Sequence, residues 1–85
     1  DELITLEGIT AVVVVGERND AIHLSGRSRD DRVHMGRALE NAVEGIGEAS
    51  AGGHARMGGG RLPATEEDSR EALVDRIFDS LEGDV

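Results

Sequence analysis

The stretch AVVVVGERNDAIHLSGR, residues 11–27, decides the fold of this chain. Its first part belongs to a β-branched run, GITAVVVVGE at 8–17, in which apolar and polar residues do not alternate. Such a run predicts a central strand that is buried on both faces. The polar sequence ERND at 17–20 follows it and indicates a turn.

The second part of the stretch, AIHLSGR at 21–27, alternates between apolar and polar residues. Ile22 and Leu24 are therefore predicted to face a core. The opposite face receives three polar side chains, those of His23, Ser25 and Arg27. Because the link between the two parts is short, they are expected to pair as an antiparallel hairpin.

Two helices and one more strand are expected after the hairpin. Apolar residues at helical spacing predict a first helix over 33–47 and a second helix that ends at Gly83. Between them, SAGGHARMGGG at 50–60 is interpreted as a glycine-rich loop that passes into a short strand before Pro63. The order predicts an α/β fold, with a small mixed β-sheet flanked by two main helices.

The composition is that of one small domain in an acidic protein. The 85 residues include 18 acidic and nine basic residues, and every basic residue is arginine. No cysteine is present, and the apolar runs are too short for a bilayer, which needs about 20 residues. We therefore expect a soluble, cytoplasmic protein without a membrane partner. The acidic, lysine-free composition favours a halophile as its source.

Net positive charge is confined to two parts of the chain. Residues 18–37 carry five arginines against three acids, and residues 50–65 carry two arginines and no acid. Glycines allow close approach to a ligand, and successive amides in such a loop form an anion site. With His54 and Arg56 nearby, a phosphate is the expected ligand. The alternative is that the glycines only let a helix and a strand pack closely.

A catalytic or metal-binding motif is not evident. The glycines do not fit a P-loop or a dinucleotide-binding fingerprint. The sequence RDDRVH at 29–34 places two acids near a histidine, but acids in a turn before a helix are the favoured interpretation. The spacing of the residues alone therefore indicates a binding module.

Three segments together resemble the C-terminal substrate-binding domain of the DHH phosphoesterases, such as RecJ-type exonucleases, nano-RNases and cyclic dinucleotide phosphodiesterases. The segments are IHLSGRS, VHMGRALENAV and AGGHARMGG, within residues 9–62. The family pattern has a strand ending in S-x-R-S, a V-[DN]-[VLI]-[GA] turn before a helix, and a G-G-G-H-x-x-A-A-G loop. In this chain Ala51 stands for the first glycine, Met57 and Gly58 stand for the alanine pair, and His34 stands for the usual Asp or Asn.

The resemblance implies where substrate would bind. Residues matched to the family motifs, together with the neighbouring arginine, form the expected phosphate- and substrate-binding set: Ser25, Arg27, Ser28, Gly52, Gly53, His54, Arg56 and Gly59. The implied ligands are single-stranded nucleic acid, a short oligonucleotide or a dinucleotide. The implied partner is an N-terminal DHH domain, which would hold Mn²⁺ or Mg²⁺, whereas this domain needs no cofactor.

These expectations divide the chain into the end of an interdomain linker at 1–8 and the DHH-associated domain at 9–83. Residues 1–7 fit the tail of a preceding helix. Without its catalytic partner the domain is expected to bind substrate but not to hydrolyse it. The alternatives are a nucleotide-sensing module without a hydrolase and a structural interaction domain.

Overall fold

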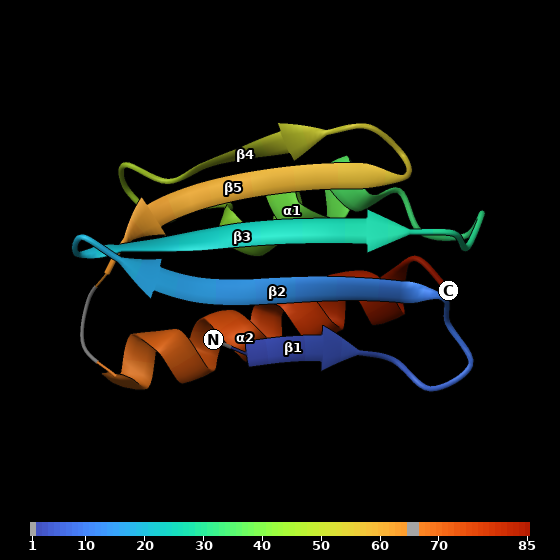
Figure 1. Ribbon diagram of the computed structural model, residues 1–85, viewed down its shortest axis with the longest axis horizontal. Coiled ribbons are helices and arrows are strands. Elements are labelled where there is room, and N and C mark those ends of the chain that lie inside the picture. Colours follow the sequence, from blue (N-terminus) through green and yellow to red (C-terminus); the bar gives the residue numbers. More distant parts are fainter. Residues whose placement is uncertain (1, 65–66) are drawn as a thin grey trace.

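The fold is an antiparallel sheet with two helices on one of its faces (Figure 1). A computed structural model describes residues 2–64 and 67–85. The elements in chain order are β1 (Glu2–Thr5), β2 (Ala11–Arg18), β3 (Ala21–Ser28), α1 (Met35–Val43), β4 (Ser50–Gly53), β5 (Met57–Pro63) and α2 (Glu67–Gly83). The strand order is β1-β2-β3-β5-β4.

The predicted α/β class is confirmed, but the prediction of a mixed sheet is wrong. Every pair of hydrogen-bonded strands in the described part of the chain is antiparallel. The helix α1 does carry the chain from β3 to a strand of the same direction, β4. The two are not neighbours, because β5 returns between them and runs antiparallel to both.

The hairpin of β2 and β3 is confirmed. Its two strands pair over their full length, from Ala11 opposite Ser28 to Arg18 opposite Ala21. Asn19 and Asp20 make the turn with φ of 53° and 60°. Positive φ at both central residues is the geometry of the tightest hairpin turns, and Asn and Asp tolerate it better than most residues.

Only one face of β2 is covered, so the prediction of a strand buried on both faces is wrong. Val13 and Val15 are 0% exposed and point to the helices, whereas Val14 between them is 38% exposed. Both helices lie behind the sheet in Figure 1. The β-branched run therefore reflects strand propensity on both faces, but burial on only one.

The first helix is shorter than its periodicity predicts. It begins at Met35 and ends at Val43, not over 33–47. Gly45 has a φ of +83°, which turns the chain out of the helix. Ile46 still packs partly against the core from this turn, which explains why it continued the helical pattern.

Two strands occupy segments for which other structures are predicted. The expected helix tail in residues 1–7 is wrong, because Glu2–Thr5 form β1 and Ile4 pairs with Val13 at the edge of the core. The predicted strand before Pro63 is confirmed as β5. The glycine stretch is not simply a loop, because Ser50–Gly53 form β4 and pair with β5.

The core lies between the sheet and the helix layer. It consists of Ile4, Ala11, Val13, Val15, Ile22, Leu24, Val33, Met35, Ala38, Leu39, Ala42, Val43, Leu62, Leu73, Ile77 and Leu81. Arg70 of α2 ties the helix layer to the sheet, with ion pairs of 3.4 Å to Glu2 and 3.5 Å to Glu17. No other element within residues 2–64 and 67–85 covers the opposite face of the sheet.

Candidate phosphate-binding site

The three segments singled out in the sequence meet at one end of the sheet. There β3 ends, α1 begins and residues 54–56 connect β4 to β5 (Figure 1). We call residues 54–56 the β4–β5 turn. Its three carbonyl oxygens accept hydrogen bonds from the backbone N–H groups of Gly36 (2.9 Å), Met35 (2.8 Å) and Ser28 (2.9 Å). The turn is thus fixed to both the end of β3 and the first residues of α1.

The N–H groups of the β4–β5 turn, unlike its carbonyl groups, form no hydrogen bonds to β3 or α1. His54 donates to the carbonyl of Met57 at 2.7 Å. The N–H groups of Ala55 and Arg56 have no hydrogen-bond acceptor within residues 2–64 and 67–85. Both residues are exposed, so these N–H groups are available to a ligand. Successive free backbone N–H groups in a turn can bind an anion.

Charged side chains surround a depression beside this turn. The depression has a volume of about 410 Å³, and its lining consists of Asp30, Asp31, Arg32, Val33, His34, Arg37, Ala55 and Arg56. Arg56 lies 3.7 Å from Asp31, but both side chains are largely exposed, so this ion pair contributes little. An anionic ligand can therefore compete with Asp31 for Arg56.

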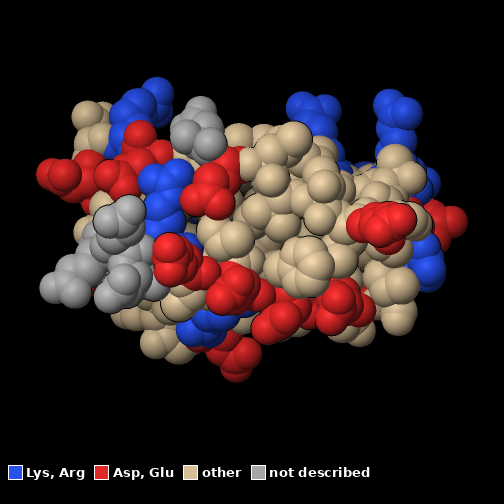
Figure 2. All heavy atoms as spheres, turned by 90° about the horizontal axis from the view of Figure 1, so that it is seen from below, with Lys and Arg blue, Asp and Glu red and all other residues tan. Residues whose placement is uncertain are grey.

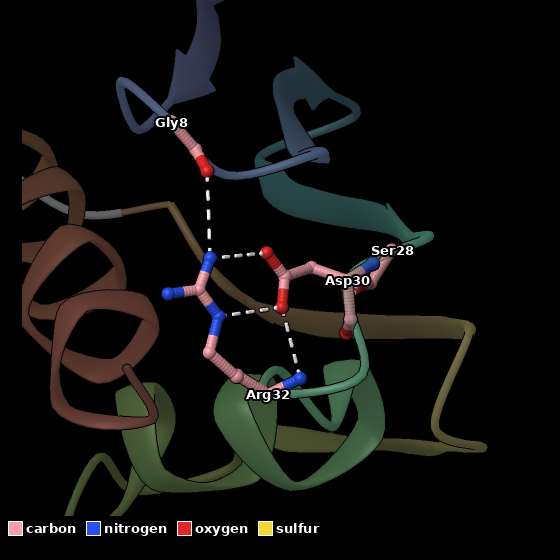
Figure 3. A network of polar contacts seen from close by, with 4 residues as sticks. All are labelled: Gly8, Ser28, Asp30 and Arg32. Atoms are coloured by element: carbon pink, nitrogen blue, oxygen red, sulfur yellow. Dashed lines mark hydrogen bonds and ion pairs between the residues drawn. The ribbon is translucent and has the colours of Figure 1, made fainter.

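Asp30 and Arg32 form a closed pair at the rim of the depression (Figure 3). The Asp30 carboxylate accepts hydrogen bonds from Nε of Arg32 at 3.0 Å and from its terminal nitrogen at 2.7 Å. The backbone N–H of Arg32 adds a third at 2.9 Å, and its guanidinium also reaches the carbonyl of Gly8 at 3.4 Å. These bonds to Arg32 lower the pKa of Asp30 to about 2. Two nitrogens of the Arg32 guanidinium are therefore occupied by Asp30.

His34 was not among the predicted binding residues, and it begins the helix at this site. Its Nδ1 accepts a hydrogen bond of 3.1 Å from the N–H of Arg37, which makes His34 the N-cap of α1. Asp and Asn, which the family pattern places here, are favoured N-caps for the same reason. The position in the pattern was the signal for this role.

Several glycines are required by close packing rather than by a ligand. A Cβ on Gly36 would lie 2.5 Å from the carbonyl carbon of Gly53, and a Cβ on Gly58 would lie 3.1 Å from Cα of Gly36. Gly53 also has a φ of +145°. Gly36 and Gly58 let the first turn of α1 lie directly on the β4–β5 hairpin, whereas a Cβ on Gly53 would lie 2.4 Å from the carbonyl oxygen of Met57 within the hairpin. Within the glycine stretch, close packing therefore accounts for Gly53 and Gly58.

Two other predicted glycines have no such requirement. A Cβ on Gly52 would have its nearest neighbour at 3.8 Å, and one on Gly59 at 3.4 Å, both ordinary contact distances. The two residues face each other across β4 and β5. Packing within the described part of the chain therefore does not require glycine at either position.

The predicted site residues divide into two groups. Gly53, His54 and Arg56 lie at or beside the β4–β5 turn, and Ser28 contacts the turn through its backbone. The Ser28 side chain is 3% exposed and its hydroxyl bonds with the backbone of Asp30 at 3.1 Å. The second group lies on the strands beyond the turn and consists of Ser25, Arg27, Gly52 and Gly59.

Arg27 connects the two groups. It is exposed on the uncovered face of β3 and pairs in register with Met57, the residue that follows the turn. Ser25 lies opposite Gly59 on the same face. Neither side chain points into the depression, since its lining comes from the loop before α1 and from the turn.

Two further findings concern metals and membranes. Within residues 2–64 and 67–85, no three His, Asp or Glu side chains lie close enough to hold a metal ion together. In the same part of the chain, neither helix has the length and apolar composition that crossing a bilayer requires.

Comparison with known proteins identifies relatives of this chain. The sequence model described as the DHHA1 domain matches residues 1–83. An uncharacterized protein of Methanocaldococcus jannaschii is 35% identical over 63 residues, which are 74% of this chain. The chain corresponds to only 12% of the length of that relative.

Proposed function

This chain belongs to the DHHA1 domain family, and we propose that it is the substrate-binding domain of a DHH-family phosphodiesterase, holding a substrate phosphate at its β4–β5 turn. The substrate class is single-stranded nucleic acid, a short oligonucleotide or a dinucleotide. The partner is a DHH domain, in the same polypeptide or in a complex.

The observation that carries this proposal is the difference between the carbonyl groups and the N–H groups of the β4–β5 turn. All three carbonyls are engaged with β3 and α1, while the N–H groups of Ala55 and Arg56 have no acceptor in the described part of the chain. A phosphate oxygen offers acceptors to both N–H groups. The Arg56 guanidinium can add a charge-assisted hydrogen bond, and exposed His54 belongs to the same turn.

The chemical contribution of this domain would be to position the substrate. A phosphate held by a turn that is itself hydrogen-bonded to two elements has little freedom to move. Such restraint lowers the entropic cost of bringing the scissile bond to the attacking group. In this proposal the DHH domain would bind Mn²⁺ or Mg²⁺, which would activate the attacking water, so this chain alone would not hydrolyse the substrate.

An amide NMR titration of the 85-residue chain with pApA tests the proposal. We expect the largest shifts at Ala55 and Arg56, with smaller shifts at His54. In Arg56→Gln we expect the affinity for pApA to fall about tenfold, because a charge-assisted hydrogen bond is lost.

Arg76→Gln is the matched control. It removes the same charge from α2, where Arg76 bonds to the carbonyl of Glu44 away from the turn. The proposal is wrong if pApA shifts no amide of the turn, or if the two variants weaken pApA equally. Circular dichroism spectra of both variants verify that they remain folded.

A further inference from the structure

The uncovered face of the sheet carries chemistry that the β4–β5 turn does not use. We propose that this face is a track for the nucleotides of a single strand whose end is held at the turn, so that the preferred ligand is an oligonucleotide longer than a dinucleotide. The inference rests on the proposed function and narrows its substrate class.

The first support is the separation of charge between the two layers. By register, the uncovered face of β1, β2, β3 and β5 comprises Leu3, Thr5, Val12, Val14, Gly16, Arg18, Ala21, His23, Ser25, Arg27, Met57, Gly59, Arg61 and Pro63. This set holds three arginines and no acid, although the chain has 18 acids. The three arginines form no ion pair within the described part of the chain.

Acidic side chains gather on the other side. The exposed surface of the two helices carries more acids than arginines: Glu40, Glu71, Asp75, Asp79 and Glu82 against Arg37 and Arg76. In Figure 2, acidic residues crowd the side on which α2 lies, and arginines project from the opposite side. The sheet face is therefore locally positive in a molecule with a net charge of −9, which selects an anionic occupant.

The second support is the regular spacing of polar groups along β3. His23, Ser25 and Arg27 lie on one face at every second residue, which corresponds to about 6.7 Å between neighbours. Arg61 of β5 lies opposite His23. Donors repeat along the strand at an interval that the extended backbone of a nucleic acid can follow.

The third support is the flat, partly apolar centre of the face. Gly16 and Gly59 present bare backbone, and apolar side chains stand beside them: Met57 is 50%, Val14 38% and Leu3 69% exposed. Bases can lie against such a surface. None of these residues is aromatic, so stacking is weak and phosphate contacts dominate binding.

The track is continuous with the turn. Arg27 pairs with Met57, which follows the turn directly, and Arg61 lies four residues further along β5. The distance from Arg27 to Arg61 along the sheet is about 13 Å. A dinucleotide held at the turn would end before Arg61, whereas a strand of about six nucleotides would reach Arg61 and Arg18.

A second copy of this chain is the competing occupant, since its acidic helix layer also complements the sheet face. Such a contact joins two different surfaces. It therefore leaves a free sheet face and a free helix layer at each end and continues into a filament, unless the geometry closes a ring. A nucleic acid strand is the favoured occupant for two reasons. It covers the face without forming an open-ended assembly, and the track begins at the proposed phosphate site.

The experiment compares pApA with a 5′-phosphorylated hexa-adenylate on the 85-residue chain, at salt concentrations from about 50 to about 200 mM. We expect the hexamer to bind about tenfold more tightly than pApA at the low end of this range. In the double variant Arg18→Gln, Arg61→Gln, the hexamer should lose affinity, and its salt dependence should weaken by about 0.7 for each arginine removed. The affinity for pApA should not change. Arg76→Gln is again the control for net charge.

The outcomes separate this inference from the proposed function. If pApA binds at the turn but the hexamer binds no tighter, or the double variant behaves like Arg76→Gln, the track is wrong and the phosphate site stands. If neither ligand binds, both are wrong. If sedimentation shows that the free chain associates and that the double variant does not, the face binds another copy and the track is wrong.

Discussion

Asp30 shows how one residue fixes the loop that precedes the binding site. Its carboxylate closes a ring of hydrogen bonds with the side chain and the backbone N–H of Arg32 (Figure 3). The backbone N–H of Asp30 is held in turn by the hydroxyl of Ser28 at 3.1 Å. Asp30 thus joins the end of β3, through its backbone, to the approach to α1, through its carboxylate.

The lowered pKa of Asp30 predicts how this loop responds to acid. The pKa falls from 3.8 to about 2 because Arg32 bonds to the ionised carboxylate. The folded state therefore favours the ionised carboxylate. The contribution of this carboxylate to the free energy of unfolding is nearly complete above about pH 4 and is lost as the pH falls towards 2. We expect Asp30→Asn to be less stable than the wild type by a constant amount above about pH 5.

Urea unfolding from pH 7 to pH 2 measures this difference. The free energies of unfolding of the two proteins should converge as Asp30 takes up its proton. A difference that stays constant down to pH 2 would show that the ionised carboxylate is not what stabilises the loop.

At the scale of elements, the β4–β5 hairpin depends on where its glycines lie. Gly53 has a positive φ, and an added Cβ would collide with the backbone of β5. We expect Gly53→Ala to destabilise the fold by about 1–3 kcal/mol, as overpacking does. Gly59→Ala should stay within about 0.5 kcal/mol of the wild type, since its Cβ meets only ordinary contacts.

Thermal unfolding followed by circular dichroism compares these two variants. Gly59→Ala should in addition weaken oligonucleotide binding, because its new methyl group stands on the face proposed as the track. Equal losses of stability in the two variants would contradict the assignment of Gly53 to packing and Gly59 to ligand approach.

The elements also show what could be predicted from the sequence. The β2–β3 hairpin was predictable, because ERND gives a turn signal and residues 21–27 alternate. The edge strand β4 was not, because Gly52 and Gly53 have low strand propensity and extend only through pairing with β5. The uncovered face was also not predictable from local sequence, since the placement of both helices on one side is a tertiary property.

The candidate site was also predictable only in part, because some of its features depend on tertiary contacts. The motifs around Arg27 and His54 lie together at the end of the sheet where β3 ends and the β4–β5 turn begins, as their resemblance to one family pattern suggests. The distinction between packing glycines and glycines open to a ligand depends on the approach of α1 to the hairpin, which spacing does not show. The capping role of His34 follows from its place before the helix, but only once the helix is known to begin at Met35.

At the scale of the whole molecule, the separation of charge affects stability as well as binding. Acids crowd the exposed helix surface, whereas the arginines of the sheet face project from the opposite side (Figure 2). Few attractive pairs offset this repulsion. The pair that joins Arg56 to Asp31 is exposed, and Arg70 serves both Glu2 and Glu17. Repulsion within the helix layer is therefore expected to destabilise the folded chain at low salt.

Salt should reverse this effect. The screening length falls from about 10 Å at 0.1 M to about 3 Å at 1 M, so repulsion between exposed acids fades while the buried core is unaffected. We expect the Tm of the 85-residue chain to rise steadily between these NaCl concentrations.

In the double variant Asp75→Asn, Asp79→Asn, the Tm at low salt should be higher and its rise with salt smaller, since two of the repelling charges are gone. Arg18→Gln, Arg61→Gln is the opposite control, because it makes the net charge more negative without touching the helix layer. If the rise in Tm is the same in all three proteins, salt acts through the hydrophobic core, and the charge of the helix layer does not limit stability.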